Sequence, residues 1–290
     1  SRRQRQMCIR DSLLPVAVQA QENTEFIPGE VWKDTDGNPI NAHGGGILYH
    51  EGTYYWYGEF KGDSTYRLDW VKTWECWRAE AGGVACYSSK NLTDWKFETI
   101  LASNENGDIG TMWECPDFFE LDGKYVLLTS PQDMLPEGLE FHNGNGTLCI
   151  IGELDPETHT LKEQFCQGVD YGIDYYAMQT LLAPDGRRIM IAWMQNWDTL
   201  AYRCNDSGWF AQMSLPRELS VKNGRLYQVP IRELNAMRAN KVEYNNVVIK
   251  DTRLTLDQIE GRTVDLELVI RPADKDNLYK KFELCFAENE

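Results

Sequence analysis

The chain has 290 residues, of which 42% are hydrophobic and 12% aromatic, and its formal net charge at pH 7 is -16. This length and apolar content allow one large hydrophobic core, or one core with a small second domain. The negative charge excludes nucleic acid as a partner, because a phosphate backbone would be repelled over most of the surface. No window approaches the roughly 18 to 20 apolar residues that a membrane-spanning helix needs, so we expect no membrane span.

The eight cysteines give no metal-site pattern. There is no Cys-x-x-Cys pair and no Cys/His spacing of the zinc type. Nothing resembles a phosphate-binding loop either. We therefore predict neither a metal nor a cofactor.

The first 24 residues are set apart from fold reasoning. Residues 1–12 resemble translated sequencing-adapter sequence, and we interpret them as an artefact. Residues 13–20, "LLPVAVQA", followed by "QEN", resemble the end of an export signal with small residues before a cut after Ala20. They predict a secreted or periplasmic protein; the alternative is a cytoplasmic one.

Short runs with alternating apolar and polar residues follow along the chain. Each run is bounded by turn residues such as "EGT", "DGK" or "KNGR", which is typical of β-hairpins. Because helical periodicity is almost absent, we predict an all-β fold. The strand pairs recur every few tens of residues, which favours a β-propeller over residues 25–232 rather than a sandwich. The runs are 44–59, 82–89, 117–130, 146–155, 187–194 and 208–230.

The last part of the chain is predicted to be a second domain, residues 233–290. A short amphipathic stretch at 231–239 is interpreted as a connector. Alternation resumes at 262–272 and 280–288, which predicts the opening strands of a β-sandwich. So few residues cannot complete a sandwich with a core of its own, so we expect a truncated domain.

Five motifs in the second half of the chain carry a family resemblance. In this order they resemble the glycoside hydrolase family 32 β-fructosidases over about residues 108–270. The resemblance implies a five-bladed propeller followed by a sandwich, and hydrolysis of terminal β-fructofuranosyl bonds with retention. The motifs are "WECPDFF" (113–119), "DYGIDYYAMQT" (170–180), "IAWMQNW" (191–197), "MSLPREL" (213–219) and "QVPIREL" (228–234).

The first hundred residues resemble a related family instead. The segments 41–59 and 82–98 are similar to the galactan-degrading branch of glycoside hydrolase family 43. The join would fall near residues 98–110. A family 32 protein would carry a further blade with an Arg-Asp-Pro motif there, and this sequence contains no such motif. We therefore expect closer to four blades than five, and a hybrid reading frame is one explanation.

Glu114 matches the acid/base of family 32. Glycosidases need two carboxyl groups, about 5 to 5.5 Å apart in retaining enzymes and about 6.5 to 9.5 Å apart in inverting ones. A neighbouring indole, Trp113, would lower the local polarity and favour the protonated acid. Pro116 fixes the backbone just beyond it. We predict that Glu114 is the catalytic proton donor; the alternative is a surface Glu at a strand start.

The second carboxyl group is less evident from the sequence. Family 32 places an Asp in an Asn-Asp-Pro-Asn-Gly motif, and Ala42 stands at the matching position. Asp174 is the best remaining candidate, with a structural role in a turn as its alternative. Glu59 is either a sugar-contacting group or a strand-end residue in solvent. The predicted substrate-binding residues are Asn41, His43, Glu59, Trp113, Asp117, Asp174, Tyr176, Gln179 and Trp193.

Three functions remain open at this point. The first is a β-fructofuranosidase acting on sucrose, a fructo-oligosaccharide or another small carbohydrate. The second is an exo-acting β-galactanase of the family 43 type. The third is a propeller that binds carbohydrate with an incomplete catalytic set, which the missing Asp and Arg-Asp-Pro favour.

Overall fold

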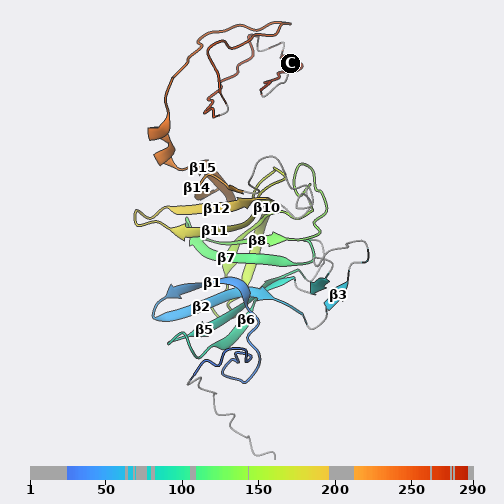
Figure 1. Cartoon of the computed structure of the whole chain (residues 1–290), viewed down its shortest axis with the longest axis vertical. Coiled ribbons are helices and arrows are strands. Elements are labelled where there is room, and N and C mark those ends of the chain that lie inside the picture. Colours follow the sequence, from blue (N-terminus) through green and yellow to red (C-terminus); the bar gives the residue numbers. More distant parts are fainter. Residues whose placement is uncertain are drawn as a thin grey trace, which may run out of the picture. The chain divides into compact units, whose positions relative to one another are not determined.

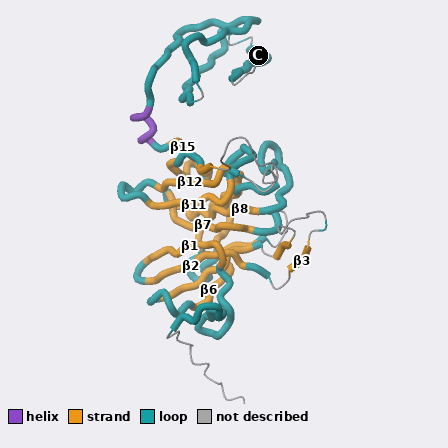
Figure 2. The backbone as a smooth tube through the Cα atoms, in the orientation of Figure 1, coloured by secondary structure: helices purple, strands orange, loops and turns teal. Residues whose placement is uncertain are grey.

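A computed structural model describes residues 25–62, 65–67, 69, 77–79, 82–104, 109–142, 144–195, 212–261, 263–274, 276 and 278–286. In these residues the regular structure is strand apart from one short 3-10 helix (Figure 2), which confirms the all-β prediction. The chain divides into two units after Ile231. Residues 1–24, interpreted as an artefact and an export remnant, lie outside the described residues. Within the described part, no helix has the length and apolarity to cross a membrane.

The described residues of the first unit contain three larger antiparallel sheets, each with its main strands in chain order, and one two-stranded sheet. Figure 1 colours them from blue through green to yellow and orange. The first sheet comprises β1 (His43–His50), β2 (Thr53–Phe60), β5 (Gly83–Ser89) and β6 (Lys96–Ser103). The second comprises β7 (Trp113–Leu121), β8 (Lys124–Pro131), β9 (Leu148–Leu154) and β10 (Leu161–Gly168). The third comprises β11 (Tyr176–Leu182), β12 (Arg188–Met194), β14 (Arg217–Lys222) and β15 (Arg225–Pro230), with β13 (Gln212–Met213) beside β12. The two-stranded sheet pairs β3 (Thr65–Arg67) with β4 (Trp77–Ala79).

Three of the hairpins turn as the sequence predicted. Both loop residues have positive φ in the pairs Glu51-Gly52, Asp122-Gly123 and Asn223-Gly224. Two consecutive residues of this conformation form the type I′ turn, whose twist matches that of the flanking strands. The "EGT", "DGK" and "KNGR" signals therefore set the register of these hairpins directly.

The second sheet lies between the other two (Figure 1). Its first strand, β7, contacts β1 and β2 on one side and β11 on the other. Both faces of this sheet are consequently buried. Along β8, Val126 and Leu128 join the core shared with the third sheet, whereas Leu127 joins the core shared with the first. This alternation is the period of two expected for a strand.

The described residues do not confirm the number of blades that the sequence predicted. We expected close to four blades of a five-bladed type, and the described residues form three larger sheets that do not close into a ring. Residues 30–42, which precede the first predicted strand run, form turns around one isolated bridge between Lys33 and Pro39.

The second unit also differs from the expectation. It begins with the 3-10 helix η2 (Arg232–Met237), and its described residues up to 286 contain no strand. The predicted sandwich strands at 262–272 and 280–288 are therefore not formed in the described residues. Their apolar side chains, such as Leu266 and Phe286, are exposed. Alternation predicts a strand only where a partner strand and a packing surface are available to cover it.

The core between the second and third sheets provides a stability test. Leu128→Ala removes a fully buried side chain and should lower the free energy of unfolding by about 2 to 5 kcal/mol. Leu182→Ala is the control, because this β11 leucine is 63% exposed. It should change stability by less than about 0.5 kcal/mol. Urea unfolding measures both, and equal losses would contradict the assigned core.

Candidate active site

The first strand of each sheet is interrupted at a similar place. Its ladder with the next strand is irregular between His43 and Gly46, between Glu114 and Asp117, and between Tyr176 and Gln179. Each interruption contains one residue with positive φ: Gly44 in β1, Cys115 in β7 and Ala177 in β11. Such bulges bend a strand and redirect its side chains, and they are frequent beside active sites.

Cys115 is held in this conformation by two hydrogen bonds from other sheets. Its N–H donates to Oε1 of Glu59 on β2 at 3.1 Å. Its carbonyl accepts from Nε2 of Gln179 on β11, also at 3.1 Å. A left-handed conformation costs a residue other than glycine roughly 1 to 2 kcal/mol, so it persists only where contacts of this kind fix it.

Glu114 directly precedes Cys115. Its carboxyl group is held through one of its two oxygens. Oε2 accepts hydrogen bonds from the Tyr176 hydroxyl at 2.6 Å and from Gln132 Nε2 at 2.8 Å. Its main-chain carbonyl accepts from Thr129 Oγ1 at 3.0 Å. Among the described residues, nothing donates a hydrogen bond to Oε1. The carboxyl group is thus oriented through one oxygen while the other is available.

Glu59 belongs to the same arrangement and is only 3% exposed. Its second oxygen, Oε2, lies 3.1 Å from His43 Nδ1 and 3.3 Å from Lys61 Nζ. The bond from Oε1 to Cys115 N places Glu59 one residue from Glu114. The 3.1 Å hydrogen bond, the peptide link and the length of a Glu side chain together keep the carboxyl oxygens of the two residues within about 10 Å of each other. This limit includes the separations of both retaining and inverting enzymes.

Asn41, just before β1, supports Glu59 indirectly by binding the backbone of Lys61, which pairs with Glu59. Its side-chain amide donates to the carbonyl of Lys61 at 2.6 Å and accepts from the Lys61 N–H at 3.1 Å. These bonds resemble one more rung of the β1–β2 ladder. The structure therefore gives Asn41 a role in fixing the Lys61 backbone, and its sugar contact stays a prediction.

Asp117 connects two sheets on the far side of the bulge. Its Oδ2 accepts a hydrogen bond from the Thr180 N–H at 2.6 Å. Burial raises the pKa of this carboxyl group, while the Thr180 hydrogen bonds and the charge of Arg188 act in the opposite direction. Arg188 itself lies over the Phe119 ring, 4.4 Å from its centre. Asp117 thus joins β7 to β11 and keeps Glu114 next to Tyr176.

Trp113 requires a correction. Its side chain is 2% exposed and belongs to the core that also contains Tyr57 and Phe118. Its indole N–H donates to the Ile109 carbonyl at 2.8 Å. Successive residues of a strand point to opposite faces, so Trp113 faces the core while Glu114 faces the polar cluster. It is a core residue in this structure, with almost no accessible surface for a sugar.

The remaining predicted residues lie on or next to the third sheet. Tyr176 is buried and contacts Glu114, and Gln179 holds Cys115. Trp193 is paired with Tyr176 in the β11–β12 ladder, so it lies beside that tyrosine. Asp174 is exposed in the bend that precedes β11. The structure thus brings most of the predicted set around Cys115, with Asp174 two residues from Tyr176.

Sequence reasoning missed three polar residues of this cluster. Gln132 orients Glu114, Ser130 Oγ accepts a hydrogen bond from the left-handed Ala177 at 2.9 Å, and Lys61 pairs with Glu59. Ser130 and Gln132 lie around the end of β8 and are almost fully buried. The sequence held one signal for Ser130 and Gln132, namely their place at the end of the strand predicted to pair with the Glu114 motif.

Comparison with known proteins identifies the family. Residues 68–230 match the glycosyl hydrolases family 32 N-terminal domain. The chain belongs to glycosyl hydrolase family 32. The match begins well before the join that we placed near residues 98–110, so β5 and β6 lie within the same family match.

Two curated relatives show how much of the family this chain represents. A raffinose invertase of Escherichia coli is 35% identical over 183 residues, which are 63% of this chain and 38% of that protein. A sucrose-6-phosphate hydrolase of Staphylococcus xylosus is 34% identical over 209 residues, 72% of this chain and 41% of that protein. The chain therefore spans about two fifths of the length of these relatives.

Solved structures of family 32 proteins have a similar fold. A β-fructofuranosidase of Bombyx mori matches with a TM-score of 0.57 and 30% identity, over 75% of this chain and 41% of that one. A mutant of the same enzyme in complex with sucrose matches equally well. The sucrose-6-phosphate hydrolase of Lactobacillus gasseri matches with a TM-score of 0.51 and 24% identity, over 67% and 37%, and supports the fold alone.

Gly44 allows a direct test of the Glu59 contact. A Cβ at this position would lie 2.5 Å from Glu59 Oε1, and the residue has a φ of 61°. We expect Gly44→Ala to lower the free energy of unfolding by more than about 1 to 2 kcal/mol, the cost of the left-handed conformation alone. Gly46→Ala is the matched control, because nothing lies within 4 Å of a Cβ there. Urea unfolding of both variants tests this, and equal stabilities would contradict it.

The Cys115 thiol should be unreactive near neutral pH. Burial, together with the charges of Glu59 and Glu114, raises its pKa to about 11. Only the thiolate reacts with iodoacetamide, so Cys115 should be labelled slowly at pH 8 and faster as the pH approaches that value. The exposed Cys285 is the internal reference. Peptide mass spectrometry measures both rates, and equal labelling at pH 8 would disagree with this environment.

Proposed function

We propose that this chain forms part of a β-propeller domain that hydrolyses terminal β-fructofuranosyl bonds. Sucrose or a fructo-oligosaccharide is the proposed substrate, and Glu114 is the proposed general acid. Membership of glycosyl hydrolase family 32 supports the reaction type. Relatives named raffinose invertase and sucrose-6-phosphate hydrolase support the substrate class. The three meandering sheets, with their first strands side by side, are compatible with consecutive propeller blades.

The single observation that carries the proposal is the orientation of Glu114. Tyr176 and Gln132 both donate to Oε2, which leaves Oε1 to carry the transferable proton. In the proposed reaction, Oε1 protonates the glycosidic oxygen as the bond to the anomeric carbon breaks. Oriented proton transfer of this kind contributes typically about 10²- to 10⁴-fold to the rate.

Asp174 is the proposed partner of the acid. An oxocarbenium-like centre develops at the anomeric carbon and requires a carboxylate on the other side of the sugar. Asp174 is exposed and lies two residues before Tyr176, which itself contacts Glu114. Trp193, beside Tyr176 in the ladder, would provide an apolar face for the sugar ring.

A second candidate function is sugar binding without turnover. Ala42 stands where the family motif has an Asp; it is 4% exposed and packs with Tyr87 and Trp95. This position supplies no carboxylate to the site. If Asp174 does not replace it, the chain retains the acid and the sugar-binding residues without a complete catalytic pair.

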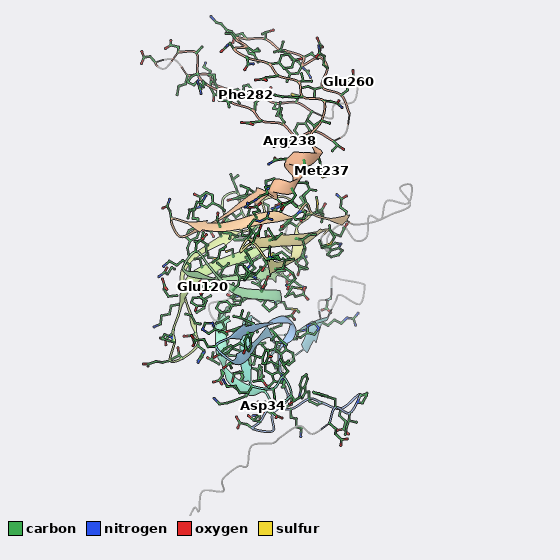
Figure 3. All side chains as sticks on the ribbon, turned by 90° about the vertical axis from the view of Figure 1, so that its left-hand side faces the viewer. Asp34, Glu120, Met237, Arg238, Glu260 and Phe282 are labelled. Atoms are coloured by element: carbon green, nitrogen blue, oxygen red, sulfur yellow. The ribbon has the colours of Figure 1, made fainter. Side chains whose placement is uncertain are left out.

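Glu114→Gln tests the proposed hydrolysis. The amide has no proton of suitable acidity to transfer, so release of fructose from sucrose should fall by about 10²-fold or more. The matched control is Glu120→Gln on the same strand, because Glu120 is exposed and lies at the margin of the second sheet (Figure 3). That variant should keep the unmodified rate. Fructose release is measured enzymatically on purified, folded protein.

The substrate panel distinguishes the alternatives. It contains sucrose, a fructo-oligosaccharide and a β-1,3-galacto-oligosaccharide. Release of galactose alone would replace the proposal by the galactanase alternative. Calorimetric binding of sucrose with no release of fructose would favour the second candidate. Equal rates in Glu114→Gln and the unmodified chain would exclude Glu114 as the acid.

A further inference from the structure

We propose that Glu59 is a positioning residue, whose carboxylate holds the Cys115 N–H and thereby sets the direction of the Glu114 carboxyl group. This inference rests on the proposed function of Glu114 and adds a role for a residue on a different sheet. The hydrogen bond from Cys115 N to Glu59 Oε1 is 3.1 Å long. It is made by the residue next to the acid, so a change at Glu59 reaches Glu114 through one peptide unit.

Burial separates this role from direct contact with the substrate. The Glu59 side chain is 4% exposed, whereas the His43 side chain beside it is 72% exposed. A carboxylate with so little accessible surface cannot meet a sugar hydroxyl without rearrangement. Its two oxygens already have partners: Oε1 accepts from Cys115, and Oε2 lies close to His43 and Lys61. The predicted sugar contact of Glu59 is therefore replaced by a structural contact to the acid's own strand.

The surroundings of Glu59 are arranged to keep the carboxylate in place. Lys61 Nζ lies 3.3 Å from Oε2, and Asn41 fixes the Lys61 backbone through two hydrogen bonds. A buried charge is stable only when it is paired and hydrogen-bonded, and these contacts meet both conditions. Gly44 leaves the space that Oε1 occupies, since any Cβ there would lie 2.5 Å from that oxygen. The residues around Glu59 thus hold its Oε1 within hydrogen-bonding distance of the Cys115 N–H.

The hydrogen bond to Glu59 matters because Cys115 is also held at its carbonyl, on the other side of the residue. Its carbonyl is held by Gln179 from the third sheet, and its φ of 52° belongs to the left-handed region. Without the acceptor on Glu59, the N–H side of this residue loses its partner and the bulge can relax to an extended strand. Because side chains on a strand alternate, relaxation by one residue turns Glu114 away from Tyr176.

The test compares substrates whose leaving groups differ in their need for a proton donor. Sucrose requires protonation of its glycosidic oxygen, whereas an aryl β-fructofuranoside with a 4-nitrophenolate leaving group does not. We expect Glu59→Ala to lower kcat/KM on sucrose by about 10²-fold. On the aryl fructoside kcat/KM should fall by less than about 10-fold, because kcat/KM reports the step in which the leaving group departs, and only sucrose needs the proton donor in that step.

Two further variants complete the design. Glu59→Gln keeps a side-chain oxygen that can accept from Cys115, so it should recover most of the activity on sucrose that Glu59→Ala loses. Glu98→Gln is the control, because Glu98 lies on β6 of the same sheet and bonds to Ser88 and Lys96 instead. It should match the unmodified chain on both substrates.

The outcomes are separable from failure of the proposed function. Equal losses on both substrates in Glu59→Ala and Glu59→Gln would overturn the positioning role in favour of direct action on the sugar. An unchanged rate in Glu59→Ala would also overturn it. If the unmodified chain hydrolyses neither substrate, the proposed function fails, and amide hydrogen exchange at Cys115 decides the inference. Faster exchange in Glu59→Ala than in Glu98→Gln supports the contact, and equal exchange refutes it.

Discussion

The candidate site depends on the backbone of one residue, Cys115, which is held from two sides. Glu59 of the first sheet accepts from its N–H, and Gln179 of the third sheet donates to its carbonyl. The residue lies on the middle sheet, so these two bonds connect all three sheets. They stabilise a left-handed conformation that is otherwise unfavourable, and we propose that this conformation sets the direction of the Glu114 side chain.

The rest of the first unit supplies the rigidity that this arrangement requires. The middle sheet is buried on both faces, with Leu127 in one core and Leu128 in the other. Asp117 adds a polar connection to Thr180, and the carboxyl group of Glu114 is then oriented by Tyr176. Two short, partly buried polar contacts on opposite sides of the bulge thus hold β7 against β11. The proposed proton donor is thus held on a strand and does not depend on a flexible loop for its orientation.

Much of the fold could be predicted from the sequence, because its signals are local. The "EGT", "DGK" and "KNGR" turns require positive φ at defined residues, and the structure has it there. The strands at 262–272 were predicted from alternation and are not formed in the described residues, since alternation does not indicate whether a partner strand exists. The number of blades also could not be predicted, because it depends on which strands find a partner strand.

The sequence predicted which residues belong to the site better than it predicted what each of them does. Glu114, Tyr176 and Gln179 come from motifs, and the structure brings them together. The assignment of Trp113 was wrong, because an indole next to a catalytic candidate on a strand faces the opposite side of the sheet. Glu59 could not be assigned from the sequence, since its partner Cys115 lies 56 positions away. Contacts across sheets are set by tertiary packing, which local patterns do not record.

A crystal structure of this chain would measure the Cys115 geometry most directly. We expect Cys115 with positive φ, its N–H within hydrogen-bonding distance of Glu59 Oε1, and its carbonyl in contact with Gln179. An extended Cys115, with the Glu59 carboxylate turned toward solvent and Glu114 separated from Tyr176, would contradict the central claim.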